Sequence, residues 1–202
     1  MKHYILLLGL LLISCDKKTL GTDSVPDEGT SDLIYEVLNQ LIKNDSAELG
    51  PKDYYVYHIS PEEVHFEPEN TDEVPLPLGI SLEYNADFQA KDSAHYNREN
   101  KILSGFELNQ HKINKKLSYI TTGELDKIIR DSGKDFWTGF NEKYKNRCIR
   151  KISVPFFNRN KRVCLVESSV SCGGLDGHGS VEIYEKINGT WVKIGSFRHW
   201  IS

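Results

Sequence analysis

The C-terminal stretch SVEIYEKINGTWVKIGSFRHWIS, residues 180–202, decides the fold because it encodes a β-hairpin. Both halves are rich in β-branched and aromatic residues, and the dipeptide Asn188-Gly189 between them is typical of a two-residue hairpin turn. Two more β-rich segments precede it, IRKISVPFF at 149–157 and RVCLVESSVS at 162–171. We therefore predict a C-terminal antiparallel meander of about four strands.

The segment 162–171 also indicates what surrounds the sheet. Val163 and Leu165 lie on one face of the predicted strand, and Cys164 and Val166 lie on the other. Because both faces carry apolar side chains, we expect both to be partly covered, one of them by helices.

Helical periodicity dominates the chain before the meander. SDLIYEVLNQLIKN, residues 31–44, predicts an amphipathic helix capped by Ser31 or Asp32. Its apolar positions share one face and are Leu33, Ile34, Val37, Leu38, Leu41 and Ile42. Residues 82–100 predict a second helix, on which Leu82, Phe88 and Tyr96 are the large apolar groups.

Two more helices are expected just before the meander. In residues 117–133, Thr121 and Glu124 have the spacing of a capping box and Gly133 can end the helix. In KDFWTGFNEKY, residues 134–144, aromatic residues recur at helical spacing, which favours a place in the core over a sugar-binding platform. Helices followed by strands predict an α+β fold, with N-terminal and central helices packed on the meander.

The strand predicted from DYYVYHIS, residues 53–60, leads into a proline-rich and acidic stretch. Residues 61–79 contain four prolines, so we expect an irregular excursion. Its acids do not have the alternating pattern of a calcium loop and favour a solvated surface; they are Glu62, Glu63, Glu67, Glu69, Asp72 and Glu73. His58 and His65 have no ligand spacing. One hypothesis is that this excursion folds on a protein partner.

The N-terminus has the features of an export signal. Lys2 precedes an apolar run, residues 4–13, of about half the length of the roughly 20 residues that span a bilayer. Residues 12–15, Leu-Ile-Ser-Cys, resemble the lipobox of bacterial lipoproteins. That resemblance implies that residues 1–14 are a signal peptide, that Cys15 is lipidated, and that the protein lies in the bacterial cell envelope, anchored to a membrane by lipid. Residues 16–30 contain almost no large apolar groups, so 15–30 is predicted to be a flexible tether to one domain at 31–202.

Composition and charge describe an ordinary globular chain with 39% apolar and 27% charged residues. The formal net charge is −4, and loss of Lys2 with the signal peptide makes it −5. An acidic balance argues against nucleic acid as a partner and against electrostatic docking on anionic lipid. We therefore expect the membrane contact to be the covalent anchor.

The segment SCGGLDGHGS, residues 171–180, is rich in glycine and also contains potential metal ligands. A strand is predicted after it, whereas a phosphate loop needs a helix N-terminus there. Cys172, Asp176, His178 and His199 are ligand types, but their spacing matches no known zinc motif. We therefore favour a structural role, in which Gly173, Gly174, Gly177 and Gly179 permit positive φ and close backbone approach in a twisted connection, with Asp176-Gly177 as a turn pair. No metal or cofactor is predicted.

Serine chemistry and disulfide formation are two further possibilities. Ser168, Ser169 or Ser171 could act as a nucleophile with His178 or His199 as base, but no Gly-x-Ser-x-Gly motif frames them. With Cys15 lipidated, three cysteines remain. Cys164 and Cys172 fall in one predicted strand, so a disulfide would join Cys148 to either Cys164 or Cys172. Three buried thiols are the alternative.

Residues 136–202 resemble the C-terminal part of uncharacterised envelope lipoproteins of Gram-negative bacteria. The resemblance rests on FWTGFNEKY, the cysteine-glycine turn, YEKINGTWVKI and the terminal WIS. It implies an envelope location and assigns no activity. The sequence thus predicts a lipid-anchored envelope protein with a binding or structural role, whose catalytic residues, if any, are unknown. The alternative is an envelope hydrolase or metal-dependent enzyme that uses the loop from Cys172 to His178.

Overall fold

The computed structural model describes residues 28–49, 54–67, 79–131 and 135–202, which form the predicted α+β fold. The helices are α1 (Glu28–Leu49), α2 (Ser93–Ser104), α3 (Thr122–Asp131) and α4 (Phe136–Tyr144), with short 3-10 turns η1 (Ala90–Asp92) and η2 (Gln110–Lys112). The strands are β1 (Tyr55–Ser60), β2 (Val64–Glu67), β3 (Ile80–Glu83), β4 (Cys148–Ser153), β5 (Phe156–Phe157), β6 (Val163–Gly173), β7 (Asp176–Ile187) and β8 (Thr190–Ile201).

The main sheet has the strand order β1-β4-β6-β7-β8, and the short strand β5 pairs with β6. The pairs β4–β6, β6–β7 and β7–β8 are antiparallel, which confirms the predicted meander. Asn188 and Gly189 both have positive φ, at 51° and 81°, as a tight hairpin between β7 and β8 requires. The sequence did not predict that β1 pairs in parallel with β4, which makes the sheet mixed.

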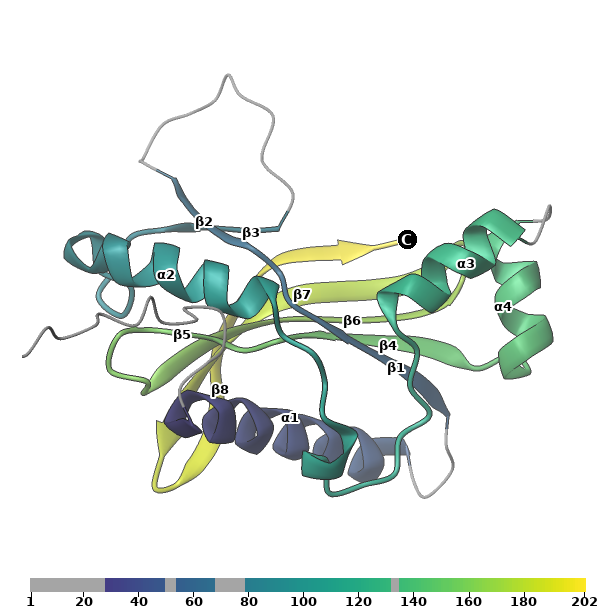
Figure 1. Ribbon diagram of the computed structural model, residues 1–202, viewed down its shortest axis with the longest axis horizontal. Coiled ribbons are helices and arrows are strands. Elements are labelled where there is room, and N and C mark those ends of the chain that lie inside the picture. The colour runs from purple at the N-terminus through teal and green to yellow at the C-terminus, as the bar shows by residue number, and fades with distance from the viewer. Residues whose placement is uncertain (1–27, 50–53, 68–78, 132–134) are drawn as a thin grey trace, which may run out of the picture.

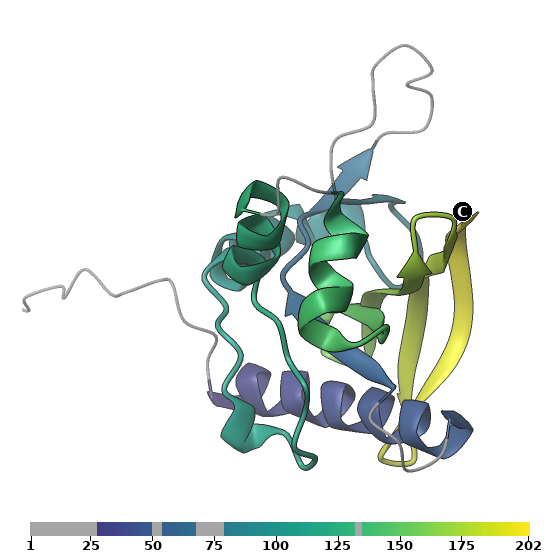
Figure 2. The same cartoon turned by 90° about the vertical axis from the view of Figure 1, so that its right-hand side faces the viewer.

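Helices lie on both sides of the main sheet (Figure 1). The helix α1 runs along one face, where Gln40 bonds the backbone of Trp191 and Lys186 is 2.8 Å from Glu36. The other helices and the small parallel sheet of β2 and β3 lie on the opposite side (Figure 2). Val163, Cys164, Leu165 and Val166 are all buried, so both faces of β6 are covered as expected.

The apolar core has two parts. The larger part joins the apolar stripe of α1 to β6, β7 and the aromatic rings around Phe66, Phe88 and Tyr96. The smaller part contains Val56 and Phe140, with Trp137 and Tyr144 packed against it. The aromatic residues of α4 therefore belong to the core, as predicted.

Several predicted boundaries were wrong. The helix α1 begins at Glu28, before the predicted caps Ser31 and Asp32, and it takes in three residues assigned to the tether. Residues 82–100 are not one helix, because β3 includes Leu82 and α2 begins only at Ser93. The excursion 61–79 contains β2, which is paired with β3.

Other predicted features can be compared only in part. The capping box is confirmed, because the backbone N–H of Glu124 donates to Thr121 Oγ1 at 3.2 Å and the N–H of Thr121 donates to Glu124 Oε2 at 3.0 Å. Gly133, the signal peptide 1–14, Cys15 and most of the tether lie outside the described residues. So do Glu69, Asp72 and Glu73. In the described part of the chain, none of the helices combines the length and the hydropathy that crossing a membrane demands.

Candidate functional site

The glycine-rich segment is a close-packed part of the β6–β7–β8 sheet. Its turn is at Gly174 and Leu175, and Asp176 and Gly177 already belong to β7, so the predicted Asp176-Gly177 turn pair was wrong. Positive φ is also absent from Gly173, Gly174, Gly177 and Gly179. The predicted close approach holds for two of them: a Cβ on Gly179 would lie 2.6 Å from Trp200 Nε1 and one on Gly177 would lie 3.2 Å from the same indole, so these two glycines leave room for Trp200.

The cysteines next to this segment are joined across two strands. Cys148 at the start of β4 and Cys172 near the end of β6 form a disulfide, one of the two pairings left open by the sequence. Cys164 is a buried free cysteine, and burial raises the pKa of its thiol. Because Cys172 is in a disulfide, it offers no thiolate to a metal. The described residues also contain no group of three or more His, Cys, Asp or Glu side chains that could hold an ion.

A pocket of about 440 Å³ opens on the sheet where the C-terminal end of α1 lies over β4 and β6. Its lining includes Asp45, Tyr55, Arg150, Ser168, Ser180 and Glu182, together with His178 and His199. The structure thus brings Ser168, His178 and His199 together, as the serine hypothesis required. Asp176, Ser171 and Cys172 do not line the pocket.

Arg150 is the central charged group of this pocket. Its side chain is 10% exposed, and its Nε lies 3.0 Å from Asp45 Oδ2. Its Nη1 donates to Ser168 Oγ at 2.7 Å and to the Ser169 carbonyl at 3.3 Å. These contacts engage the N–H groups on Nε and Nη1 of the desolvated guanidinium, and they hold its plane against the sheet.

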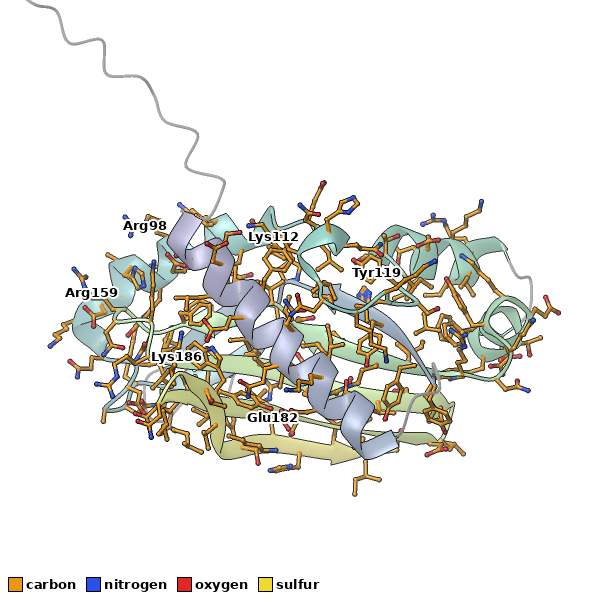
Figure 3. All side chains as sticks on the ribbon, turned by 90° about the horizontal axis from the view of Figure 1, so that it is seen from below. Arg98, Lys112, Tyr119, Arg159, Glu182 and Lys186 are labelled. Carbon is orange, nitrogen blue, oxygen red and sulfur yellow. A yellow bond between two sulfur atoms is a disulfide. The ribbon has the colours of Figure 1, made fainter. Side chains whose placement is uncertain are left out.

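Two tyrosines extend this polar network into the core. Tyr57 donates to Asp45 Oδ2 at 3.2 Å, and burial first, then the Asp45 carboxylate, raises the pKa of the Tyr57 hydroxyl. Tyr184 donates to Glu182 Oε2 at 2.5 Å, and burial and this carboxylate raise the pKa of Tyr184. Figure 3 places Glu182 on the sheet beside α1. Both tyrosines therefore stay protonated and act as hydrogen-bond donors.

The serine hypothesis gains little from this geometry. A nucleophilic serine needs a base that takes its proton, usually a histidine within hydrogen-bond reach. In the described part of the chain, Ser168 instead accepts a hydrogen bond from Arg150, and no hydrogen bond joins it to His178 or His199. Ser169 also lines the pocket, and its carbonyl accepts from Arg150 Nη1, but its side chain faces the opposite side of the sheet from Ser168 because neighbouring strand residues alternate.

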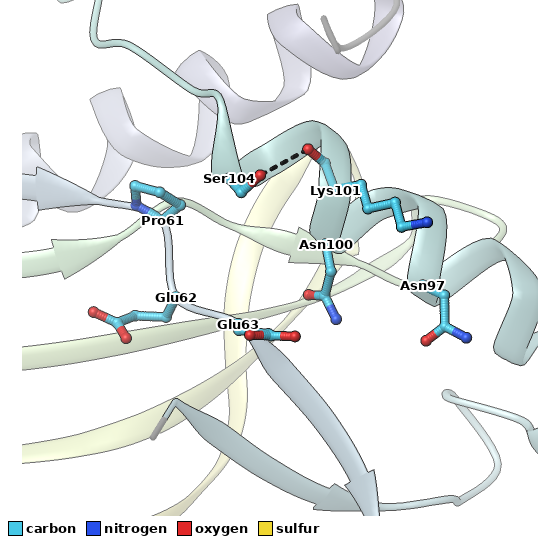
Figure 4. A pocket seen from close by; sticks show the side chains of 7 residues that line it. All are labelled: Pro61, Glu62, Glu63, Asn97, Asn100, Lys101 and Ser104. Carbon is cyan, nitrogen blue, oxygen red and sulfur yellow. Dashed lines mark hydrogen bonds between the residues drawn. The ribbon is translucent and has the colours of Figure 1, made fainter. Parts of the chain in front are cut away.

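A second cavity, of about 590 Å³, lies between the segment before β2 and the helix α2 (Figure 4). Two of its polar side chains are used in the fold. Asn100 binds both the N–H and the carbonyl of Val64, at 3.0 and 2.8 Å. Glu62 is 2.7 Å from Lys151. The cavity is larger than the Arg150 pocket, but Asn100 ties β2 to α2 and Glu62 is paired with Lys151 of β4, so we take the Arg150 pocket as the candidate site.

Sequence reasoning missed Arg150, Asp45 and Tyr57. A signal was present, because Asp45 continues the apolar stripe of α1 four residues beyond Leu41 and so points toward the sheet. Arg150 likewise occupies an inward position of β4, between Cys148 and Ile152. A charged residue at a core-facing position indicates that it is buried and needs a partner, but it does not identify that partner. No protein-family model, curated protein or solved structure matches the chain, so the role of the pocket has to be inferred from its residues.

Proposed function

We propose that the protein is a lipid-anchored binding module of the bacterial cell envelope, and that the Arg150 pocket is its ligand site. The observation that carries the binding role is a nearly buried guanidinium, fixed by Asp45, Ser168 and the Ser169 carbonyl, at an open pocket. A ligand can contact this group without a large rearrangement of the sheet. Preorganised polar groups of this kind are typical of small-ligand sites.

The envelope location is supported by two independent features of the chain. Residues 12–15 resemble a lipobox, which would place lipid on Cys15. The disulfide between Cys148 and Cys172 fits an oxidising compartment, because the cytosol keeps most thiols reduced. The tether between Cys15 and α1 would hold the domain near the bilayer.

A binding role is favoured over a hydrolase because of the state of Ser168. An arginine remains protonated and cannot act as a general base. Its hydrogen bond to Ser168 Oγ uses the oxygen as an acceptor and does not activate it as a nucleophile. The pocket is therefore better suited to hold a ligand than to attack one.

The anchor is tested by fractionating cells that express the full chain or its Cys15→Ser variant. We expect the wild type in the membrane fraction with a lipid-modified N-terminal fragment, and the variant unmodified. Cys164→Ala is the matched control, since it removes a free cysteine that is buried in the sheet. Membrane association that is the same for Cys15→Ser and the wild type would contradict the proposal.

A further inference from the structure

The guanidinium of Arg150 has one nitrogen that the fold does not use. The contacts described above engage Nε and Nη1, and within the described residues none of them engages Nη2. The buried polar side-chain atoms that lack a partner in this part of the chain are Ser81 Oγ, Asn141 Oδ1 and Trp191 Nε1. Because Nη2 is not among these buried atoms and Arg150 lines the pocket, we take Nη2 as the donor that is open to the pocket.

The charges around the pocket limit what can bind there. Asp45 offsets the charge of Arg150, and Lys193, 2.6 Å from Glu182, offsets the second carboxylate. The charges of these four side chains, Asp45, Arg150, Glu182 and Lys193, therefore sum to zero. A dianion such as a phosphate would bring two negative charges to one available nitrogen and two nearby carboxylates, whereas a carboxylate brings one charge.

The remaining lining suits a small organic acid. The Ser180 hydroxyl and the imidazoles of His178 and His199 can donate or accept hydrogen bonds, and Tyr55 provides an aromatic surface. His178 and Ser180 lie on β7 with the same orientation as Glu182, because alternate residues of a strand share a face. A carboxylate on Nη2 would therefore have hydrogen-bonding groups within the pocket, with the carboxylates of Asp45 and Glu182 already paired to Arg150 and Lys193.

We propose that the Arg150 pocket binds the carboxylate of a small organic monoanion through Nη2 of Arg150. This inference deepens the proposed function and rests on it, since it names the ligand class of the same site. It also assigns Asp45 a second role, because this carboxylate competes for the guanidinium and lowers the affinity for an added anion.

The test is calorimetric titration of the full chain carrying Cys15→Ser with N-acetylglycinate, and with the neutral N-acetylglycinamide as the matched ligand. We expect N-acetylglycinate to bind at least about tenfold more tightly than the amide, the range of one charge-assisted hydrogen bond. Equal affinities for the two ligands would overturn the inference. Tighter binding of methyl phosphate than of N-acetylglycinate would overturn it as well.

Two variants of the pair separate a ligand site from a structural ion pair. Asp45→Asn removes the competing carboxylate and should strengthen N-acetylglycinate binding by about tenfold. Asp45→Asn combined with Arg150→Gln removes both charges, so no buried charge is left unpaired, and it should abolish the preference for the carboxylate. A preference that survives in the double variant would contradict the assignment to Arg150.

If a variant is too unstable for titration, the shift of its thermal unfolding midpoint on adding ligand measures binding instead. N-acetylglycinate should raise the unfolding midpoint of Asp45→Asn more than that of the wild type, because a ligand that binds only the folded state stabilises it. No greater rise would count against the inference. If a neutral ligand bound tightly at the same residues and N-acetylglycinate showed no preference, only the ligand class would be wrong. The proposal that the protein is a binding module would stand.

Discussion

At the scale of the residue, His58 is a buried side chain that links stability to pH. It is 6% exposed, and its Nδ1 lies 3.3 Å from the Ile120 carbonyl. Burial first, and then the nearby Lys151, lowers the pKa of His58 to about 4, although Glu62 opposes this. The imidazole is therefore neutral in the folded protein at pH values where it is charged in the unfolded chain.

We expect the free energy of unfolding to fall as the pH drops from about 6.5, the ordinary pKa, toward 4. In this window the unfolded chain binds a proton that the folded protein does not bind, so stability rises with pH. The contribution of His58 amounts to about 3 kcal/mol at most. Urea unfolding of the wild type and His58→Gln at several pH values measures it. The variant should show the shallower dependence, and equal slopes would refute the assignment.

Gly179 tests the role of the glycine-rich segment. A Cβ there would lie 2.6 Å from Trp200 Nε1 and 2.7 Å from Ser169 Cβ. Gly179→Ala should therefore cost about 1 to 3 kcal/mol of unfolding free energy or displace the indole. The measurement is chemical denaturation followed by tryptophan fluorescence.

Two other glycines are controls for this substitution. Gly123 in α3 has nothing within 4 Å of the added Cβ, and Gly173 meets only Asp176 Cβ, at 4.0 Å. Gly123→Ala should be neutral or stabilising, because alanine favours helix. If Gly179→Ala proved as harmless as Gly123→Ala, close packing by Trp200 would not explain the glycine.

At the scale of the element, the disulfide joins the start of β4 to the end of β6 and closes a loop of sequence separation 24. Replacing Cys148 and Cys172 together with serine should lower the free energy of unfolding by about 3 kcal/mol, chiefly by freeing the unfolded chain. Denaturation with and without a reductant measures this. The reductant should destabilise the wild type and leave the double variant unchanged; an unaffected wild type would contradict a structural disulfide.

How far the sequence predicts an element depends on how local its signal is. The hairpin at Asn188-Gly189 and the capping box at Thr121 follow from adjacent residues, and both were confirmed. The pairing of β1 with β4 joins Tyr55 to Cys148 across most of the domain, and no short pattern encodes it. The strands β2 and β3 have four residues each and flank a proline-rich stretch, so their periodicity is too short to detect.

In the candidate site, too, single residues could be recognised from the sequence, whereas their proximity could not. His178, His199 and Ser168 were recognised because their residue types suggest chemistry, but their proximity depends on the register of β6, β7 and β8. Arg150 and Asp45 are 105 positions apart, and only the packing of α1 across the sheet joins them. Charge at inward positions could have predicted that each is buried, but not that they form a pair.

At the scale of the whole molecule, our account combines an anchor with a pocket. The proposed anchor would fix the chain to a membrane through Cys15, while the pocket lies near the C-terminal end of α1. Within the described residues, Asp45 of the pocket lies about 25 Å along α1 from the first residue of that helix, Glu28.

The most direct test of the central claim is a map of backbone amide shifts in the full chain carrying Cys15→Ser during titration with N-acetylglycinate. The account predicts that the largest shifts cluster at residues 168–170 and 178–182, around Arg150. It predicts small shifts at residues 62, 63, 97 and 100, which line the larger cavity. Largest shifts at that cavity, or no saturable shift around Arg150, would contradict the claim that this pocket is the binding site.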